Sequence, residues 1–435
     1  MPIINELDIQ VFFIVFFLTL VVNYILLGKL RFSLVDPIWI MVIINTTLTL
    51  TLVIYDRLMQ NDFVIVIYLV LCQFFFAAGA RFSKWCVVRN IIPLILPVGY
   101  AEAVNSRRTL WLLNASTFIL VVILSYYIAT GIPVFDSDPE LARALGKTGG
   151  GGAIARLTNV FTYLSLTLWF YVRVKRIRIG RVSKTLGIAL PFILLLSVGA
   201  KSSLISIYVS YYYVSCFISF ETRKPFKHSA IFFVLTIISI LIVTFSLVYT
   251  RGTLVSASMS PSEFATSQIL QRIFFTGIGA YHYFSINFSD LNHLTAFDYF
   301  NQYLVLPLLA PLRLISYEPT VGKILAVSMV GDDTFGPNPS MYVEGIIFYG
   351  WLGGIFYCGM LGIIFSVFRY YPLTLNRFPS FLRVVSFSFG CFLVSTMTYD
   401  MILFMGDVYN TLFLSAPILI GVMMVGQSIS QRKKL

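Results

Sequence analysis

Two side chains in this sequence have the type and setting that proton transfer requires. His282 lies in Tyr281-His282-Tyr283, where a ring that titrates near neutral pH is flanked by aromatic residues. Such a histidine suits abstraction of a proton from a hydroxyl group, and an interfacial histidine without a chemical role is the alternative. Glu344 comes about one turn into a long apolar stretch. An acid there is costly unless it faces a wet cavity or a cation, so it is a candidate site residue.

Six basic residues are candidates for binding a diphosphate. Guanidinium groups match phosphate oxygens in a bidentate way and stay charged at any pH. The candidates, on the membrane face that is otherwise acidic, are Arg143, Arg156, Lys201, Arg251, Arg272 and Arg313. Snorkelling of a long side chain toward the headgroups is the alternative for any single one of them. Together they predict a site for a membrane-anchored polyphosphate.

Patterns for metals and nucleotides are weak. Asp332-Asp333 is interpreted as a solvated turn rather than a divalent-metal site, because the pair has no further ligands beside it. The glycines from Gly149 to Gly152 lack the spacing of a phosphate-binding loop and predict a flexible hinge or lid. The five cysteines show no paired spacing. We therefore expect no disulfide, no metal and no cofactor.

The elements that hold these residues are predicted to be membrane helices. A chain of 435 residues with 58% apolar and 11% charged residues is not an ordinary soluble domain. About 20 apolar residues cross the hydrocarbon core as a helix, and such stretches recur along the whole chain. We predict an all-α, polytopic membrane protein with a single transmembrane domain over 1–435 and about 11 spans, within a range of roughly 10 to 14. The spans are expected near 9–28, 38–54, 63–80, 109–130, 157–172, 185–200, 202–220, 229–249, 342–368, 384–405 and 408–428.

Basic residues orient the spans, since short loops rich in Lys and Arg remain cytoplasmic. Clusters over 173–184 and 432–434 therefore predict an outer N-terminus and a cytoplasmic C-terminus. The net charge of +12 follows from this topology and not from a nucleic-acid surface. The start of the chain, with Glu6 and Asp8, lacks the positive segment of a cleavable signal peptide, so the first span is expected to remain as an anchor.

Two outer loops are predicted between the spans. The first is a lid-like loop over 131–156, and the second is a large structured loop over 250–341. Within the second, 303–330 is apolar but interrupted by prolines, which predicts re-entrant or interfacial helices over a substrate cleft. Gly350 and Gly354 have the small-xxx-small spacing that lets helices approach closely, which indicates packing.

Several segments together resemble a known family. They are the turn Gly199-Ala200-Lys201-Ser202-Ser203, the large outer loop with its arginines, and a closing helix with Glu344, Phe348, Gly350 and Gly353. This layout is similar to that of the bacterial O-antigen or oligosaccharide repeat-unit polymerases, over most of the chain in architecture but with weak motifs. Lys201 stands where the family pattern leads us to expect an arginine.

The resemblance implies a GT-C-like glycosyltransferase of the bacterial inner membrane. Such an enzyme moves a growing glycan from undecaprenyl diphosphate onto the next lipid-linked repeat unit, on the periplasmic side and without a nucleotide sugar. By resemblance, Arg251 and Arg272, with Lys201 or Arg313, would bind the diphosphate. His282 or Glu344 would deprotonate the acceptor hydroxyl, with inversion at the anomeric carbon. The implied partners are the lipid-linked donor and acceptor, a flippase and a chain-length regulator, and no nucleic acid.

Three alternatives stay open. A lipid-glycan ligase would share the donor chemistry and differ in its acceptor. A flippase for lipid-linked oligosaccharides would be basic and polytopic too, but it should show repeated halves and charges spread through a central cavity. An acyltransferase would need a histidine inside a span, and the predicted spans contain none.

Overall fold

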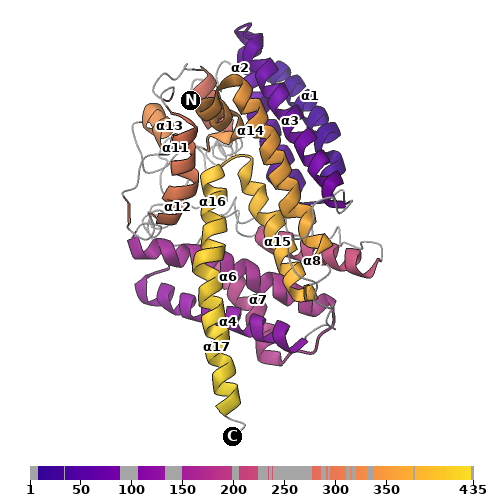
Figure 1. Ribbon diagram of the computed structural model, residues 1–435, viewed down its shortest axis with the longest axis vertical. Helices are drawn as coiled ribbons and strands as arrows, with labels where there is room; N and C mark the ends of the chain where they lie inside the picture. The colour runs from indigo at the N-terminus through magenta and orange to yellow at the C-terminus, as the bar shows by residue number, and fades with distance from the viewer. Residues whose placement is uncertain are drawn as a thin grey trace, which may run out of the picture. The chain divides into compact units, whose positions relative to one another are not determined.

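The computed structural model is α-helical, and no β-strand occurs among the residues that it describes (Figure 1). These residues are 8–33, 35–88, 106–132, 149–197, 205–223, 234, 238, 277–285, 291, 294–309, 314–315, 320–330, 338–375 and 378–432. The chain divides into two compact units, which we describe separately. Unit 1 comprises Met1–Pro93, Leu247–Tyr370 and Leu393–Gly406, and unit 2 comprises Leu94–Ser246, Tyr371–Phe392 and Asp407–Leu435.

Unit 1 begins with a layer of three helices that pack on one another, drawn in indigo and violet in Figure 1. They are α1 (Ile9–Leu27), α2 (Asn45–Met59), which is preceded by the π-helix η3 (Trp39–Ile44), and α3 (Phe63–Val88). The later elements are the helical segment 277–285, α11 (Ala296–Phe300), η7 (Asn301–Val305), α12 (Leu306–Leu309), α13 (Val321–Val330) and most of α14 (Ser340–Thr374).

Small residues allow α3 and α14 to approach closely. A methyl group added at Gly79 would lie 2.1 Å from the carbonyl oxygen of Gly359, and one added at Gly362 would lie 2.0 Å from that of Phe76. In a membrane, where apolar side chains gain little by leaving lipid, such backbone contact is a main source of helix association. The two helices therefore pack through their glycines.

A chain of buried hydrogen bonds links four helices of unit 1. Asn23 of α1 donates to Thr47 of α2 at 2.8 Å, and Gln73 of α3 donates to the Asn23 carbonyl at 2.7 Å. The Tyr342 hydroxyl of α14 donates to the Gln73 carbonyl at 2.7 Å. Because every member finds a partner, these polar side chains are tolerated inside the bundle and connect α14 to the N-terminal layer.

Unit 2 is a second group of packed helices. It contains α4 (Ser106–Thr130), α6 (Gly149–Val174), α7 (Arg181–Ser197), α8 (Ile205–Thr222) and α17 (Ala416–Arg432). α6 contacts α4, α7 and α8. Its buried Tyr163 hydroxyl donates to the carbonyl of Ser388 at 3.1 Å. Ser388 lies on α15 (Ser380–Met397), which is followed by α16 (Met401–Tyr409) and the π-helix η9 (Asn410–Ser415).

Seven helices among the described residues are long and apolar enough to cross a membrane. They are Gln10–Leu30, Met41–Met59, Phe63–Val87, Arg107–Thr130, Ser340–Thr374, Ser380–Met397 and Met401–Met424, all overlapping predicted spans. The protein is thus an all-α membrane protein with several spans. Three more predicted spans coincide with the helices α6, α7 and α8, and 229–249 lies almost entirely outside the described residues. The count of eleven, the GT-C-like architecture, the single domain and the orientation stay predictions.

The predicted boundary between the last two spans is wrong. α15 ends at Met397, and α16 begins at Met401 and continues through η9 into α17. The turn between them therefore falls inside the predicted span 384–405. Hydropathy alone did not mark this turn, because most of the residues on either side of it are apolar.

The predicted span 342–368 is not one straight helix. α14 is interrupted at Gly350, whose φ of 69° and ψ of −173° are not helical. A methyl group added at Gly345 would lie 3.0 Å from the Cα of Gly354. In a straight helix two residues so far apart in sequence are separated by about 13 Å, so the short half before Gly350 folds back onto the long half. The positive φ explains why glycine stands at the turn.

Candidate functional site

Glu344 lies on the short half of α14 and is fully buried. Its Oε1 accepts hydrogen bonds from the Tyr303 hydroxyl at 3.0 Å and from the backbone amide of Met401 at 3.3 Å. Its Oε2 accepts one from the Tyr357 hydroxyl at 3.0 Å. None of the ion pairs among the described residues includes Glu344. Neutral donors therefore hold this buried carboxylate in a single orientation.

The start of α14 is tied to the turn that precedes α16. The amide of Ser340 donates to the carbonyl of Tyr399, and the amide of Met341 donates to that of Thr398, both at 3.1 Å. Asp400 follows this turn and caps α16, since its Oδ1 accepts a hydrogen bond from the amide of Leu403 at 2.8 Å. These backbone bonds bring a second acid to the same place as Glu344.

Glu344 and Asp400 line one small cavity of about 170 Å³. Its other polar side chains are Tyr303, Thr320 and Lys323. Because a water molecule occupies about 30 Å³ of liquid, the cavity has room for a few waters or for one small group of a larger substrate. Among the residues that the structure describes, two acids, one cation and two hydroxyl groups thus line one partly open cavity in unit 1.

Burial changes how the groups around this cavity titrate. Burial raises the pKa of the half-buried Asp400 to about 6, although the amides of Leu403 and Ile402 act in the opposite direction. The pKa of the Tyr303 hydroxyl is raised well above its usual value by burial and then by the charge of Glu344. Tyr303 therefore remains a hydrogen-bond donor, while Asp400 changes its charge near neutral pH.

An aromatic cluster surrounds Glu344. Tyr299 packs on Tyr303 with ring centroids 4.5 Å apart and on Phe348 at 5.3 Å, and Tyr349 stacks on Tyr357 at 5.5 Å. The Tyr299 hydroxyl also donates to that of Tyr357 at 3.4 Å. The two tyrosines that bond to Glu344 are therefore themselves held by neighbouring rings.

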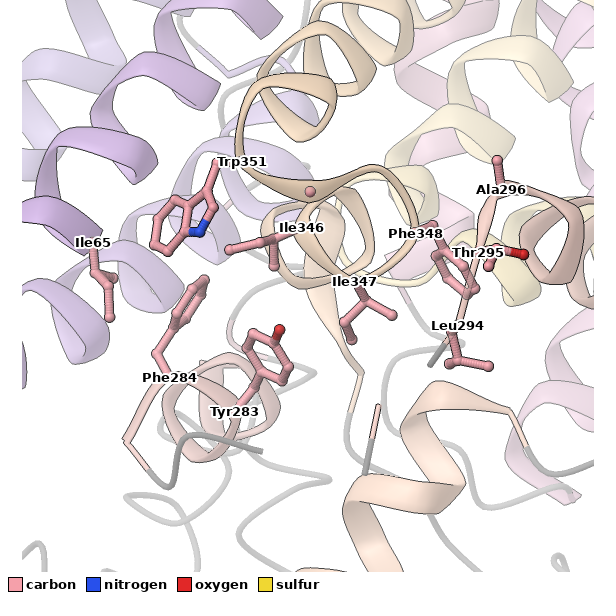
Figure 2. A pocket seen from close by; sticks show the side chains of 11 residues that line it. Ile65, Tyr283, Phe284, Leu294, Thr295, Ala296, Ile346, Ile347, Phe348 and Trp351 are labelled. Atoms are coloured by element: carbon pink, nitrogen blue, oxygen red, sulfur yellow. The ribbon is translucent and has the colours of Figure 1, made fainter. Parts of the chain in front are cut away.

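A larger cavity of about 580 Å³ lies beside the turn at Gly350 (Figure 2). In the view of Figure 2, Trp351, Phe284 and Ile65 are at one end, and Phe348, Thr295 and Leu294 are at the other. Most of its lining side chains are apolar or aromatic, and polar atoms are exposed among them, which suits a ligand that has both ring faces and polar groups. Phe348 also contacts Tyr303 of the smaller cavity, with ring centroids 5.6 Å apart.

His282 has a different setting from Glu344. It lies in the helical segment 277–285, and its Nε2 is 2.8 Å from the hydroxyl of Ser328 on α13. Burial lowers the pKa of its imidazole, which favours the neutral form. It is not among the residues that line the smaller cavity, whereas its neighbour Tyr283 lines the larger one. The structure therefore does not join His282 and Glu344 in one small site.

Of the six predicted diphosphate ligands, only Arg156 lies among the described residues. It is half-buried on α6 of unit 2. Those outside the described residues are Arg143, Lys201, Arg251, Arg272 and Arg313, together with Asp332 and Asp333. Gly149 to Gly152, predicted as a hinge, form the first turn of α6. Among the described residues, no group of three or more His, Cys, Asp or Glu could hold a metal ion.

Sequence reasoning did not single out Asp400, Tyr303 or Lys323 as site residues. A signal for Asp400 was present, because it is an acid inside the predicted apolar span 384–405, the same reason that drew attention to Glu344. Tyr303 and Lys323 carry no such signal, since tyrosine and lysine are ordinary in interfacial segments. Only their positions around the cavity distinguish them.

Comparison with known proteins found no matching protein-family model, no matching curated protein and no matching solved structure. The site is therefore interpreted from its own geometry.

Proposed function

We propose that this protein is a membrane glycosyltransferase that polymerises undecaprenyl-diphosphate-linked oligosaccharide repeat units, into O-antigen or a similar surface polysaccharide, on the periplasmic side. The observation that carries the proposal is the smaller cavity, where Glu344 and Asp400 share one space with Lys323 inside an all-helical membrane protein. Polar and ionisable groups are expensive among membrane helices and mark sites of function by default.

The cavity offers the groups that such a transfer needs on the acceptor side. Transfer from a lipid diphosphate requires that a hydroxyl of the acceptor sugar lose its proton as it attacks the anomeric carbon. A carboxylate within hydrogen-bonding reach is a suitable general base. Both acids line the cavity, and Thr320 lines it too, with a hydroxyl group that can orient a sugar.

The residues proposed to bind the donor diphosphate are assigned more from the sequence than from the structure. The leaving diphosphate needs cations that stabilise its developing charge, and Lys323 is the cation that lines the cavity. The proposal also keeps Arg251, Arg272, Lys201, Arg313, Arg156 and Arg143 as diphosphate ligands. The larger cavity beside the Gly350 turn, with its aromatic lining, is suited to hold the sugars that flank the reacting groups.

The test is the chain-length distribution of the surface polysaccharide after deletion of the gene from its native bacterium. Loss of long chains, with single repeat units still reaching the surface, is the expected result. Loss of all surface glycan would indicate a ligase or a flippase instead, and an unchanged distribution would exclude all three functions.

The same deletion strain, complemented with variants, tests the site. The double variant Glu344→Gln/Asp400→Asn keeps the size of both side chains and should fail to restore long chains, with the protein present in the membrane at wild-type level. Asp62→Asn is the control, because Asp62 pairs with Arg57 and lines neither cavity. This variant should restore the long polysaccharide chains. Full restoration by the double variant would remove the smaller cavity from the proposed function.

A further inference from the structure

Glu344 and Asp400 line the same cavity but are held in different ways. Both oxygens of Glu344 accept hydrogen bonds, one of them from two donors. Asp400 accepts from backbone amides at the start of α16, and no side chain among the described residues donates a hydrogen bond to it. The Glu344 lone pairs are thus largely occupied, whereas Asp400 is the acid with room for an incoming hydroxyl.

Helix capping does not explain why position 400 carries a charge. Ser, Thr and Asn cap helices about as well as Asp, so a neutral residue would serve α16 equally. An aspartate instead places a second acid beside a fully buried one, and like charges at one site cannot both ionise cheaply. The ionisable group at position 400 therefore indicates a role beyond helix capping.

Of the two acids, Asp400 is the one suited to exchange protons. Residue Asp400 keeps some solvent exposure, whereas Glu344 has none and is surrounded by its tyrosine and amide donors. The titratable side chains that line its cavity are Tyr303, Lys323 and Glu344. The pKa of Asp400 near 6 places its ionised form at neutral pH, close to the pH at which a general base works best.

We propose that Asp400 is the catalytic base of the transfer and that Glu344 is a positioning residue that holds Tyr303, Tyr357 and the start of α16 around it. This assignment rests on the proposed function. A carboxylate oxygen of Asp400 takes the proton of the acceptor hydroxyl while the hydroxyl oxygen forms its bond to the anomeric carbon. The bond from that carbon to the diphosphate oxygen breaks, and the lipid diphosphate leaves with the electron pair. Asp400 then releases its proton to water.

The inference predicts different pH profiles for two variants. Purified full-length protein, reconstituted in vesicles with the native lipid-linked repeat unit, should extend glycans at a rate that falls below about pH 6 as Asp400 becomes protonated. Asp400→Asn should lower the rate on the order of 100-fold or more and abolish that acidic fall, because the titrating base is gone. Glu344→Gln, which keeps an oxygen acceptor, should retain the acidic fall and lose no more than about tenfold in rate.

The outcomes separate the inference from the function on which it rests. A wild-type protein that extends no glycan in this assay contradicts the proposed function itself. If the wild type is active, a wild-type rate in Asp400→Asn overturns the assignment alone. So does the reversed pattern, in which Glu344→Gln abolishes the acidic fall and Asp400→Asn preserves it. The unfolding temperature of each variant, compared with the wild type, shows whether a lost rate is a lost fold.

Discussion

Two buried carboxylates, one near each end of α14, have opposite electrostatic environments. Near its C-terminal end, Arg369 forms a buried ion pair with Asp36, and side-chain exposure is 1% and 0% for the two residues. Arg369 also donates to the carbonyl of Leu30 at 3.2 Å. Near its N-terminal end, Glu344 is bonded by neutral groups and has an acid, Asp400, in the same cavity. The charge of Asp36 is therefore neutralised by a cation, whereas Glu344 shares its cavity with a second acid.

This difference separates structural from chemical use of charge. Where the fold needs a buried acid only to join segments, it provides a full countercharge and fills the remaining acceptor positions, here with the amides of Phe32 and Ile38. Near Glu344 the fold instead leaves a space and places a group that titrates near neutral pH. We therefore look for function at the N-terminal end of α14 and for stability at the C-terminal end.

The largest expected effect is on the structural pair. Arg369→Ala leaves Asp36 buried without its cation and should cost about 3–5 kcal/mol of unfolding free energy. The measurement is the thermal unfolding of the detergent-solubilised protein. Arg173→Ala is the control, because Arg173 is exposed and stacks over Trp169, so its loss should cost less than about 1 kcal/mol. Equal losses in the two variants would contradict a structural role for the pair.

A smaller effect is expected from the tyrosines at Glu344. Tyr303→Phe removes one hydrogen bond to a carboxylate with little change in side-chain volume, and should cost about 1.5–3 kcal/mol if the acceptor is charged. Tyr163→Phe is the comparison, because the Tyr163 hydroxyl is also buried but its partners are neutral, the carbonyl of Ser388 at 3.1 Å and the hydroxyl of Ser388 at 2.8 Å. It should cost about 0.5–1.5 kcal/mol in the same unfolding measurement. A cost below about 1.5 kcal/mol for Tyr303→Phe would show that Glu344 is not a charged acceptor.

The smallest effect is the pH dependence of stability that Asp400 contributes. Its folded-state pKa of about 6 lies above the usual value of 3.8, so the folded protein holds this proton more tightly than the unfolded chain. The stabilisation is complete below pH 4 and is lost as pH rises through about 6. Raising the pH from 5 to 7 should therefore lower the unfolding temperature of the wild type more than that of Asp400→Asn. Parallel curves for the two proteins would show that Asp400 does not titrate in this range.

The sequence predicted the helices better than their connections. Long apolar stretches indicate helices in a membrane whatever their partners are, and Glu344 was found because an acid inside such a stretch is conspicuous. The turn before Asp400 could not be predicted in the same way, because the backbone bonds of Ser340 and Met341 from a distant segment hold it in place. The reversal at Gly350 was equally hidden, since Gly353 and Gly354 nearby look no different in sequence.

The reversal at Gly350 also decides which residues of α14 must be apolar enough to cross the lipid bilayer. The long half after the turn, residues 351–374, spans about 36 Å at 1.5 Å per residue and is sufficient to cross the hydrocarbon core by itself. Residues 340–349 then do not need to cross the hydrocarbon core. Folded back against the long half, they need only match their protein neighbours, and substitutions there are limited by neighbouring side chains rather than by membrane thickness. A buried acid such as Glu344 can persist in such a segment because lipid tails never have to solvate it.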